Sequence, residues 1–193
     1  VLMGEYDVVV MNPPYGQTID WSIIPEADEA NKNFYCAFLL RARALLSKDG
    51  YVGALTDRTY LLLNSFARFR TSILHTMPIL TGLDLGWDIL DDANVATIAA
   101  VFGTSQSIRQ ATFIQCLDVT EKETCLQSEL AHCGSEKQGA FTFLVELSDL
   151  EIIPTHPFCY WAPSQIRQAF KEYKKLEPGF GIVRKGLSPG NTP

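Results

Sequence analysis

The segment Asn12-Pro13-Pro14-Tyr15 is the part of the chain whose residue types and spacing best suit chemistry. Its two prolines fix two φ angles and remove two N–H donors, and the residue before a proline is pushed out of the helical region. The segment is therefore predicted to be a stiff, extended loop whose carbonyl groups point outward without competing donors. We expect the Asn12 side-chain carbonyl and the Pro13 backbone carbonyl each to accept one N–H of an exocyclic aromatic amine.

An aromatic amine needs such acceptors because its nitrogen lone pair is delocalised into the ring and is a poor nucleophile. Two carbonyl acceptors favour a tetrahedral nitrogen and aim its lone pair at a methyl donor, so catalysis consists mainly of positioning and charge stabilisation. Tyr15 offers a flat face for a base that has left its duplex. The alternative is a rigid proline turn with a packed tyrosine, since isolated motif matches often mislead. The predicted strand before the motif and the helix and strand after it favour the functional interpretation.

The surrounding elements are predicted to place this loop at the end of a parallel strand. Residues 6–11 form a short β-branched run typical of a buried strand, and open α/β sheets bind ligands beyond the carboxyl ends of such strands. Further predicted elements are a loop over 16–32, a helix that Asn33 caps and Asp49-Gly50 ends, a strand over 51–55, a helix capped by Ser65, and strands over 79–85 and 95–102. This order predicts half of a doubly wound α/β sheet that ends in a hairpin.

The pattern is less regular beyond residue 105. We predict a strand within 111–119, a polar surface excursion over 120–138, and an amphipathic helix that Ser164 caps and Pro178-Gly179 ends. The chain therefore divides into residues 1–105, half of an α/β sheet, and residues 106–193, a partial α+β appendage.

The composition limits the classes of function. The net charge is −6, whereas a complete DNA-binding domain is usually basic because phosphate contacts dominate affinity. Residues 164–186 are the exception, with six basic and two acidic side chains, a net charge of +4. Five cysteines without a CxxC pair indicate a reducing cytoplasm. No apolar run suggests a membrane span, and Cys125, His132 and Cys133 lack the close pairing of zinc ligands, so we expect no metal.

Several segments resemble one enzyme family. Residues 6–16 resemble the fourth strand and catalytic motif of the gamma-class amino-methyltransferases, and within them the large adenine-specific enzymes of restriction-modification and BREX-like phage-defence systems. Asn33-Phe34-Tyr35-Cys36-Ala37-Phe38 is similar to the family's next motif, Asn-Leu-Tyr-x-x-Phe. Residues 45–52 and 65–70 also look like the family. The resemblance covers about the first hundred residues and the final glycine-rich segment.

The resemblance implies a fold, a reaction and a set of site residues. The fold would be the C-terminal half of a Rossmann-like S-adenosylmethionine-dependent methyltransferase sheet. Residues 1–105 would then be the C-terminal half of the catalytic domain, and residues 106–193 an accessory region leading toward a DNA target-recognition segment. The reaction would be methyl transfer from S-adenosylmethionine to N6 of adenine in DNA, and the partners would be double-stranded DNA with a flipped adenine and other restriction or phage-defence subunits. The implied catalytic residues are Asn12, Pro13, Pro14 and Tyr15, and the residues bordering the cofactor are Asn33, Phe34 and Phe38.

The chain departs from the family in two respects. The family's glycine-rich cofactor motif and acidic ribose-binding residue lie on strands before the catalytic motif, and no glycine-rich loop precedes Asn12. We therefore expect the chain to be incomplete and inactive alone. The family also often stacks a Phe on the second face of the flipped adenine. By spacing, that position is Leu90, which has no π-face; Trp87 is the alternative, although ordinary core packing is slightly favoured for Trp87.

Two other functions stay open. The same four-residue motif serves methylation of a glutamine amide in translation release factors and of adenine in RNA. Those proteins usually end soon after the seventh strand, whereas about ninety residues follow Gly103, which favours DNA recognition. The other alternative is a non-catalytic piece that contacts DNA or other defence proteins.

Overall fold

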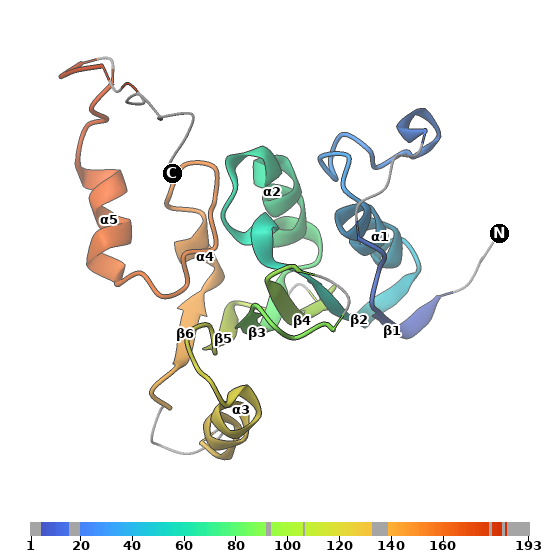
Figure 1. Cartoon of the computed structure of the whole chain (residues 1–193). Helices are drawn as coiled ribbons and strands as arrows, with labels where there is room; N and C mark the ends of the chain where they lie inside the picture. The colour runs from blue at the N-terminus through green and yellow to red at the C-terminus, as the bar shows by residue number, and fades with distance from the viewer. Residues whose placement is uncertain are drawn as a thin grey trace, which may run out of the picture.

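A computed structural model of the 193-residue chain describes residues 5–15, 20–91, 94–105, 107–132, 139–177, 179–182 and 184. Within these ranges the chain builds one mixed sheet of six strands with helices packed against it (Figure 1). The strands are β1 Tyr6–Met11, β2 Leu46–Asp57, β3 Ile79–Gly86, β4 Thr97–Gly103, β5 Gln110–Gln115 and β6 Thr142–Glu146, in the order β1-β2-β4-β3-β5-β6. The predicted α/β fold class is confirmed.

Four of the six strands point the same way. β1 pairs with β2 in parallel, β4 is antiparallel to both β2 and β3, and β3 is parallel to β5, while β6 is antiparallel to β5. The carboxyl ends of β1, β2, β3 and β5 therefore meet along one side of the sheet, here named the carboxyl edge. It is the edge at which open α/β sheets bind ligands.

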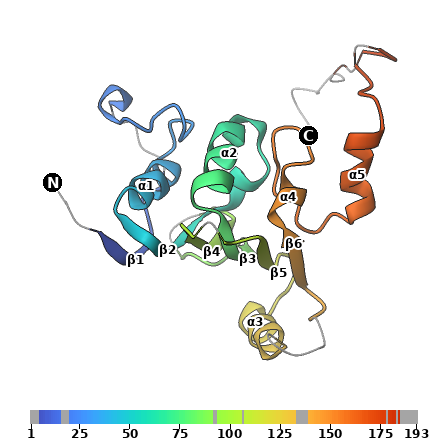
Figure 2. The same ribbon diagram turned by 180° about the vertical axis from the view of Figure 1, so that it is seen from behind.

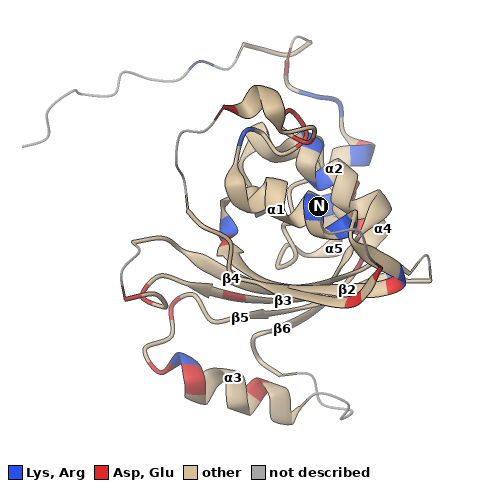
Figure 3. Cartoon of the chain, turned by 90° about the vertical axis from the view of Figure 1, so that its right-hand side faces the viewer, with Lys and Arg blue, Asp and Glu red and all other residues tan. Residues whose placement is uncertain are grey.

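The helices divide unequally between the two faces of the sheet. Helices α1 Phe34–Arg43, α2 Ala67–Thr76, α4 Leu147–Leu150 and α5 Ser164–Glu172 lie on one side, and α3 Lys122–Ala131 lies on the other (Figures 2 and 3). Three short 3-10 helices are η1 Trp21–Ile23, η2 Arg58–Leu61 and η3 Asn64–Phe66. Burial alternates along β2 in agreement with this unequal covering of the two faces. Val52, Ala54 and Thr56 are buried, and the residues between them are only partly covered. The core lies between the sheet and the helices α1, α2 and α4 on that side.

The other face of the sheet is open beside β1, β2 and β4. A groove of about 500 Å³ runs along it, and its lining is mostly apolar, including Val10, Leu55, Leu83 and Val101. Val10 is 81% exposed there. Among the described residues no strand pairs with the outer side of β1, so an apolar face and a free strand edge occur together, an arrangement that proteins usually cover.

Most of the elements predicted in residues 1–105 are present. The strand over 6–11 is confirmed at its predicted bounds as β1, and the two strands predicted over 79–85 and 95–102 are β3 and β4. The predicted burial of the first strand was wrong, because β1 is the outer strand of the described sheet and its Tyr6, Val8 and Val10 side chains are exposed. Asn33 caps α1 as predicted, since its side-chain oxygen accepts a hydrogen bond from the Cys36 backbone N–H at 3.4 Å.

The predicted end of the first helix was wrong. Helix α1 ends at Arg43, and Asp49-Gly50 lies within β2, which begins at Leu46. Leu46 pairs with Tyr6 across a register shift in the β1–β2 ladder. Gly50 allows this pairing because a Cβ there would lie only 3.0 Å from the Tyr6 carbonyl oxygen. Tertiary pairing therefore overrides the local helix-stop signal.

Both predicted serine caps were also wrong. Ser65 lies inside η3, whose backbone supplies the first turn before α2 begins at Ala67, so no side-chain cap is made. Ser164 is the first residue of α5 after Pro163, again without a side-chain cap bond. The helix α5 also ends earlier than Pro178-Gly179, because Tyr173 already has extended backbone.

The second half of the chain is more ordered than its sequence pattern suggests. The predicted strand over 111–119 is β5, whereas β6 and α4 were not predicted. The supposed polar excursion contains α3, which is anchored by the buried Glu129 carboxylate accepting a hydrogen bond from Thr142 Oγ1 at 2.7 Å. Strands β5 and β6 extend the same sheet, and the division at residue 105 stays a prediction. No helix in the described ranges is long and apolar enough to cross a membrane.

Candidate active site

Strand register brings several sequence-distant segments to the carboxyl edge. Met11, the last residue of β1, pairs with Ala54 of β2, and Thr97 at the start of β4 pairs with both Asp57 and Gly86. The segments that leave the sheet here are therefore the Asn12 loop, η2 and the turn after β3. The catalytic motif predicted from sequence lies at the edge where it was expected.

The four motif residues differ in their exposure. Asn12 and Pro14 are exposed, Pro13 is buried and Tyr15 is half-buried. The exposed Asn12 side chain is available to a ligand, while the buried Pro13 ring anchors the backbone that holds the second carbonyl. Gly16, which follows the motif, lies outside the described residues.

Tyr15 faces inward more than a surface tyrosine would. Its hydroxyl oxygen is buried and has no hydrogen-bond partner among the described residues. Burial raises the pKa of Tyr15, and the negative charge of Asp57 raises it further. The two side chains are thus close enough to interact electrostatically.

Asp57 and Asn33 organise the backbone beside the motif. Asp57 Oδ1 accepts a hydrogen bond from the Thr59 backbone N–H at 2.7 Å and so caps η2. The Thr59 hydroxyl is 2.8 Å from the hydroxyl of Tyr35, which is buried in α1. These bonds tie the first turn of α1 to the end of β2. The structure therefore gives Asn33 a helix-capping role, and a contact between Asn33 and a cofactor stays a prediction.

Phe34 and Phe38 line a small cavity beside the start of α1. It has a volume of about 280 Å³, and its walls include Trp21, Pro25, Glu26 and Arg41. The Trp21 and Phe34 rings are tilted by 45° with centroids 5.3 Å apart. Two of the three predicted cofactor residues therefore meet at one aromatic cavity, whereas Asn33 is outside its lining.

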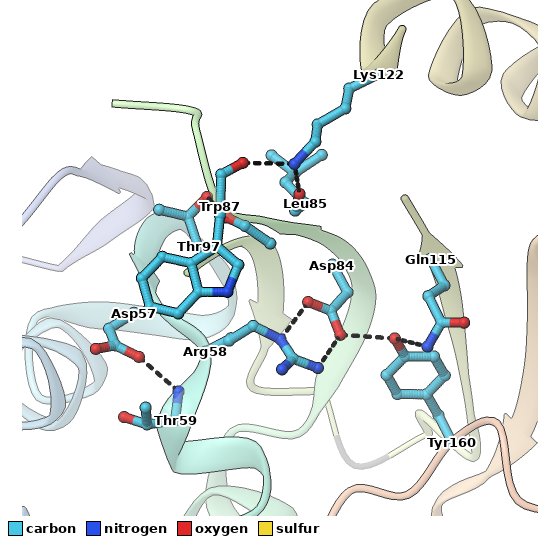
Figure 4. Close-up of polar contacts among 11 residues, drawn as sticks. Asp57, Arg58, Thr59, Asp84, Leu85, Trp87, Thr97, Gln115, Lys122 and Tyr160 are labelled. Atoms are coloured by element: carbon cyan, nitrogen blue, oxygen red, sulfur yellow. Dashed lines mark hydrogen bonds and ion pairs between the residues drawn. The ribbon is translucent and has the colours of Figure 1, made fainter. Parts of the chain in front are cut away.

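Trp87 lies on the turn that follows β3, and its predicted core packing was wrong. Its side chain is 54% exposed, whereas Leu90 is half-buried. The turn is held by Lys122 from the opposite face of the sheet, whose Nζ donates to the carbonyls of Leu85 and Trp87, each at 2.5 Å (Figure 4). Gly86 and Asp88 on either side have φ of 69° and 62°, a tight backbone that turns the indole out of the core.

A buried polar network, missed by the sequence analysis, lies behind this edge. The fully buried Asp84 of β3 accepts hydrogen bonds from Arg58 Nε at 2.6 Å and Arg58 Nη2 at 2.7 Å (Figure 4). Tyr160 donates its hydroxyl to the same carboxylate at 2.7 Å. Burial alone would lower the pKa of Arg58, but hydrogen bonding and attraction by Asp84 outweigh it and raise that pKa. The sequence signal that could have revealed this network is Asp84 itself, an aspartate within the otherwise apolar run of β3.

The remaining predictions concern metal ions and basic residues. No group of three or more His, Cys, Asp or Glu side chains in the described part could hold a metal ion; Cys133 lies outside that part. Within the basic segment, Arg167 is internal, since it is 7% exposed and pairs with Asp149 at 3.0 Å. The exposed basic residues that are described there are Lys171, Lys174, Lys175 and Arg184.

Comparison with known proteins agrees with the arrangement of strands and motif. The six-stranded sheet matches part of the methyltransferase fold found in modification subunits of restriction systems. Residues 2–88 match the family described as Eco57I restriction-modification methylase. Over that segment the chain is similar to restriction-modification DNA methylases. A comparison with curated proteins found no match.

Three solved structures illustrate the likeness. The type I restriction-modification methyltransferase subunit from Streptococcus thermophilus is 19% identical, with a TM-score of 0.62 over 81% of this chain and 38% of its own. A chain of a type I restriction-modification system is 14% identical, with a TM-score of 0.63 over 90% of this chain and 40% of its own. The protein of a DrdV–DNA complex is 14% identical, with a TM-score of 0.55 over 79% of this chain and 18% of its own. These identities establish the fold alone, and the chain spans at most about two fifths of these relatives.

Proposed function

We propose that a protein containing this chain transfers a methyl group from S-adenosylmethionine to N6 of adenine in DNA. The observation that supports it most is the Asn12-Pro13-Pro14-Tyr15 loop at the carboxyl edge of a restriction-modification methylase sheet. DNA is favoured over RNA or a protein amide because the chain continues for about ninety residues after β4 and extends the same sheet. The partners in this proposal are duplex DNA and other restriction subunits, in the cytoplasm.

The roles of the loop residues follow from their exposure. The Asn12 side-chain carbonyl and the Pro13 backbone carbonyl accept the two N–H bonds of the adenine amine, so its lone pair is localised on nitrogen and directed away from them. Tyr15 supports one face of the extruded base, and the exposed Trp87 turn supplies the second face in place of Leu90. S-Adenosylmethionine, when bound, supplies the electrophilic methyl group.

The aromatic cavity beside α1 suits part of this cofactor. Phe34, Phe38 and Trp21 offer apolar and aromatic surface, and Glu26 offers a carboxylate acceptor at the rim. These groups fit a purine ring with its attached amine or sugar hydroxyls. The free edge of β1 and the open apolar face suit the packing of a further sheet segment, which would supply the glycine-rich part of the cofactor site.

The 193-residue chain alone should bind S-adenosylmethionine weakly or not at all. The aromatic cavity offers one wall of a site, and no glycine-rich loop precedes the catalytic motif in this sequence. Isothermal calorimetry on the isolated chain measures this directly. Micromolar affinity would show that the principal cofactor site lies within these residues and that our placement of it is wrong.

The function itself is tested by product analysis of an active protein containing this chain. DNA, RNA and a glutamine-containing release-factor peptide are offered with S-adenosylmethionine, and methylated products are identified by mass spectrometry. N6-Methyladenine in DNA is expected. Methylation confined to RNA or to the peptide, or to another base of DNA, would contradict the proposal.

Substitution of Tyr15 tests the stacking role. Base–aromatic stacking is worth ~1–3 kcal/mol per base, so Tyr15→Ala should bind target DNA roughly 5–150-fold less tightly. Tyr15→Phe should stay close to the parent, because the hydroxyl has no partner among the described residues. With 2-aminopurine at the target adenine, Tyr15→Ala should show less extrusion or a brighter extruded state, since the quenching ring is gone. Unchanged fluorescence and DNA affinity in folded Tyr15→Ala would exclude Tyr15 from the base site.

A further inference from the structure

Arg58 occupies a defined position at the carboxyl edge. It directly follows Asp57, and its backbone N–H donates to the Ala96 carbonyl at 2.9 Å. Since Thr97 pairs with both Asp57 and Gly86, the segments with Arg58 and Trp87 leave the sheet on either side of β4. Adjacent strands are about 4.8 Å apart, so two such spacings separate β2 from β3, and both residues lie in the row of segments that begins with the Asn12 loop.

The guanidinium of Arg58 is held by groups from two other parts of the chain. Asp84 of β3 binds Nε and Nη2 as a two-point fork, and Tyr160 donates to the same carboxylate. Tyr160 is itself oriented, because its hydroxyl accepts a hydrogen bond from Gln115 Nε2 at 3.1 Å and its ring stacks on Phe113 with centroids 4.3 Å apart. The orientation of Arg58 is therefore set before any ligand arrives.

One donor nitrogen of this oriented guanidinium, Nη1, is unused among the described residues. Asp84 engages the Nε–Nη2 side of the planar guanidinium, so Nη1 points away from the carboxylate. Within the described part of the chain nothing accepts a hydrogen bond from Nη1, and the Arg58 side chain keeps 18% exposure. A purely structural ion pair does not need a donor nitrogen left open on a residue that follows β2 at the carboxyl edge.

The charge of the pair indicates the kind of acceptor. The Asp84 carboxylate neutralises the Arg58 cation, so the pair offers an oriented donor with little net charge and is poorly suited to a phosphate. Nη1 better matches a neutral acceptor. In the proposed base site, the neutral acceptors beside the adenine amine are the ring nitrogens N1 and N7.

We propose that Arg58 is a specificity residue that donates from Nη1 to a ring nitrogen of the extruded adenine adjacent to its amine, with Asp84 and Tyr160 as positioning residues. This inference rests on the proposed function. A donor facing N1 accepts adenine and rejects guanine, whose N1 bears hydrogen and whose O6 would face the acceptor carbonyl of Asn12. With N1 as the acceptor, loss of the hydrogen bond weakens discrimination against guanine as well as rate; with N7 as the acceptor, it weakens rate alone, because guanine also has an N7 acceptor.

Target duplexes with 1-deazaadenine or 7-deazaadenine in place of the target adenine test the contact. In an active protein containing this chain, one analogue should lower kcat/KM for methylation by about tenfold, a typical value for a hydrogen bond to a charged group. Arg58→Lys should lower kcat/KM on adenine by a similar factor and should lose most of the penalty for that analogue. Arg68→Lys, on the exposed side of α2, is the matched control and should behave as the parent.

A second variant covers the case in which Arg58→Lys unfolds. Arg58→Met combined with Asp84→Leu replaces the buried pair by apolar side chains, a change that proteins often tolerate, and it should also be insensitive to the analogue. The inference is overturned if the parent methylates adenine and both analogues at equal rates. It is also overturned if folded variants keep the full analogue penalty. Either result leaves the proposed function standing. A parent that methylates no adenine would instead refute the proposed function.

Discussion

Asn12→Ala should reduce the rate of adenine methylation by ~10²–10³, the usual cost of removing one preorganised acceptor or donor from a transition state. The acceptor matters most when the amine nitrogen becomes tetrahedral and its N–H bonds are polarised, so kcat should fall far more than DNA affinity. The Asn12 side chain is exposed, so its truncation leaves the core intact. Single-turnover methylation of a labelled duplex, with DNA affinity measured in parallel, separates the two effects.

The matched control for this substitution is Asn94→Ala. Asn94 is an exposed asparagine in the segment before β4, and no role in the site is proposed for it, so its removal should leave the rate unchanged. A rate for Asn12→Ala within threefold of the parent corresponds to less than ~1 kcal/mol of transition-state stabilisation. That result would refute the catalytic assignment of Asn12.

Arg70→Met should produce the largest loss of stability among single substitutions considered for this chain. Arg70 is fully buried, and its guanidinium donates to the carbonyls of Tyr60 at 2.6 Å, Leu63 at 2.7 Å and Thr155 at 2.8 Å. Burial lowers the pKa of Arg70 to about 10, so the group is still charged at neutral pH. The Leu63 carbonyl also accepts a hydrogen bond from the Phe66 N–H. The substitution therefore affects the carbonyls of Tyr60 and Thr155 most, because they lose the donor that Arg70 supplies.

Each buried acceptor left without a donor costs ~1–3 kcal/mol, so we expect a loss of about 3 kcal/mol. For a chain of this size that corresponds to a fall in Tm of roughly 6–12 °C. Thermal unfolding followed by circular dichroism measures it. The neighbouring Arg68→Met removes an exposed arginine and should change stability by less than ~0.5 kcal/mol; equal Tm values for the two variants would show that Arg70 does not hold these segments.

Arg70 also shows that residues 106–193 are joined structurally to residues 1–105. Thr155 and His156 have left-handed backbone, with φ of 69° and 51°, and Arg70 binds the Thr155 carbonyl from α2. A few residues further on, Tyr160 reaches Asp84. The second half of the chain thus fixes parts of the carboxyl edge, and its sequence pattern contained no sign of this.

Local signals in the sequence are sufficient to place the Asn12-Pro13-Pro14-Tyr15 loop at the end of a strand. A β-branched run followed by two prolines defines where β1 ends, and Asn33 defines where α1 begins, because both signals act within a few residues. The alternation of strand and helix through residue 103 then predicted the sheet and the edge on which the loop lies. Confirmation was possible because each of these features depends on local backbone preference and hydrophobic periodicity.

Long-range contacts complete that edge, and they form only when the chain folds. Arg58 and Asp84 are 26 residues apart, Asp84 and Tyr160 are 76 apart, and Lys122 reaches Trp87 from the other face of the sheet. The extension of β2 through Asp49-Gly50 and the exposure of Trp87 likewise depend on strand register and on contacts with distant carbonyls. Hydrogen bonds between segments that meet only after folding leave no periodic trace in sequence, so the polar network behind the motif became visible only in three dimensions.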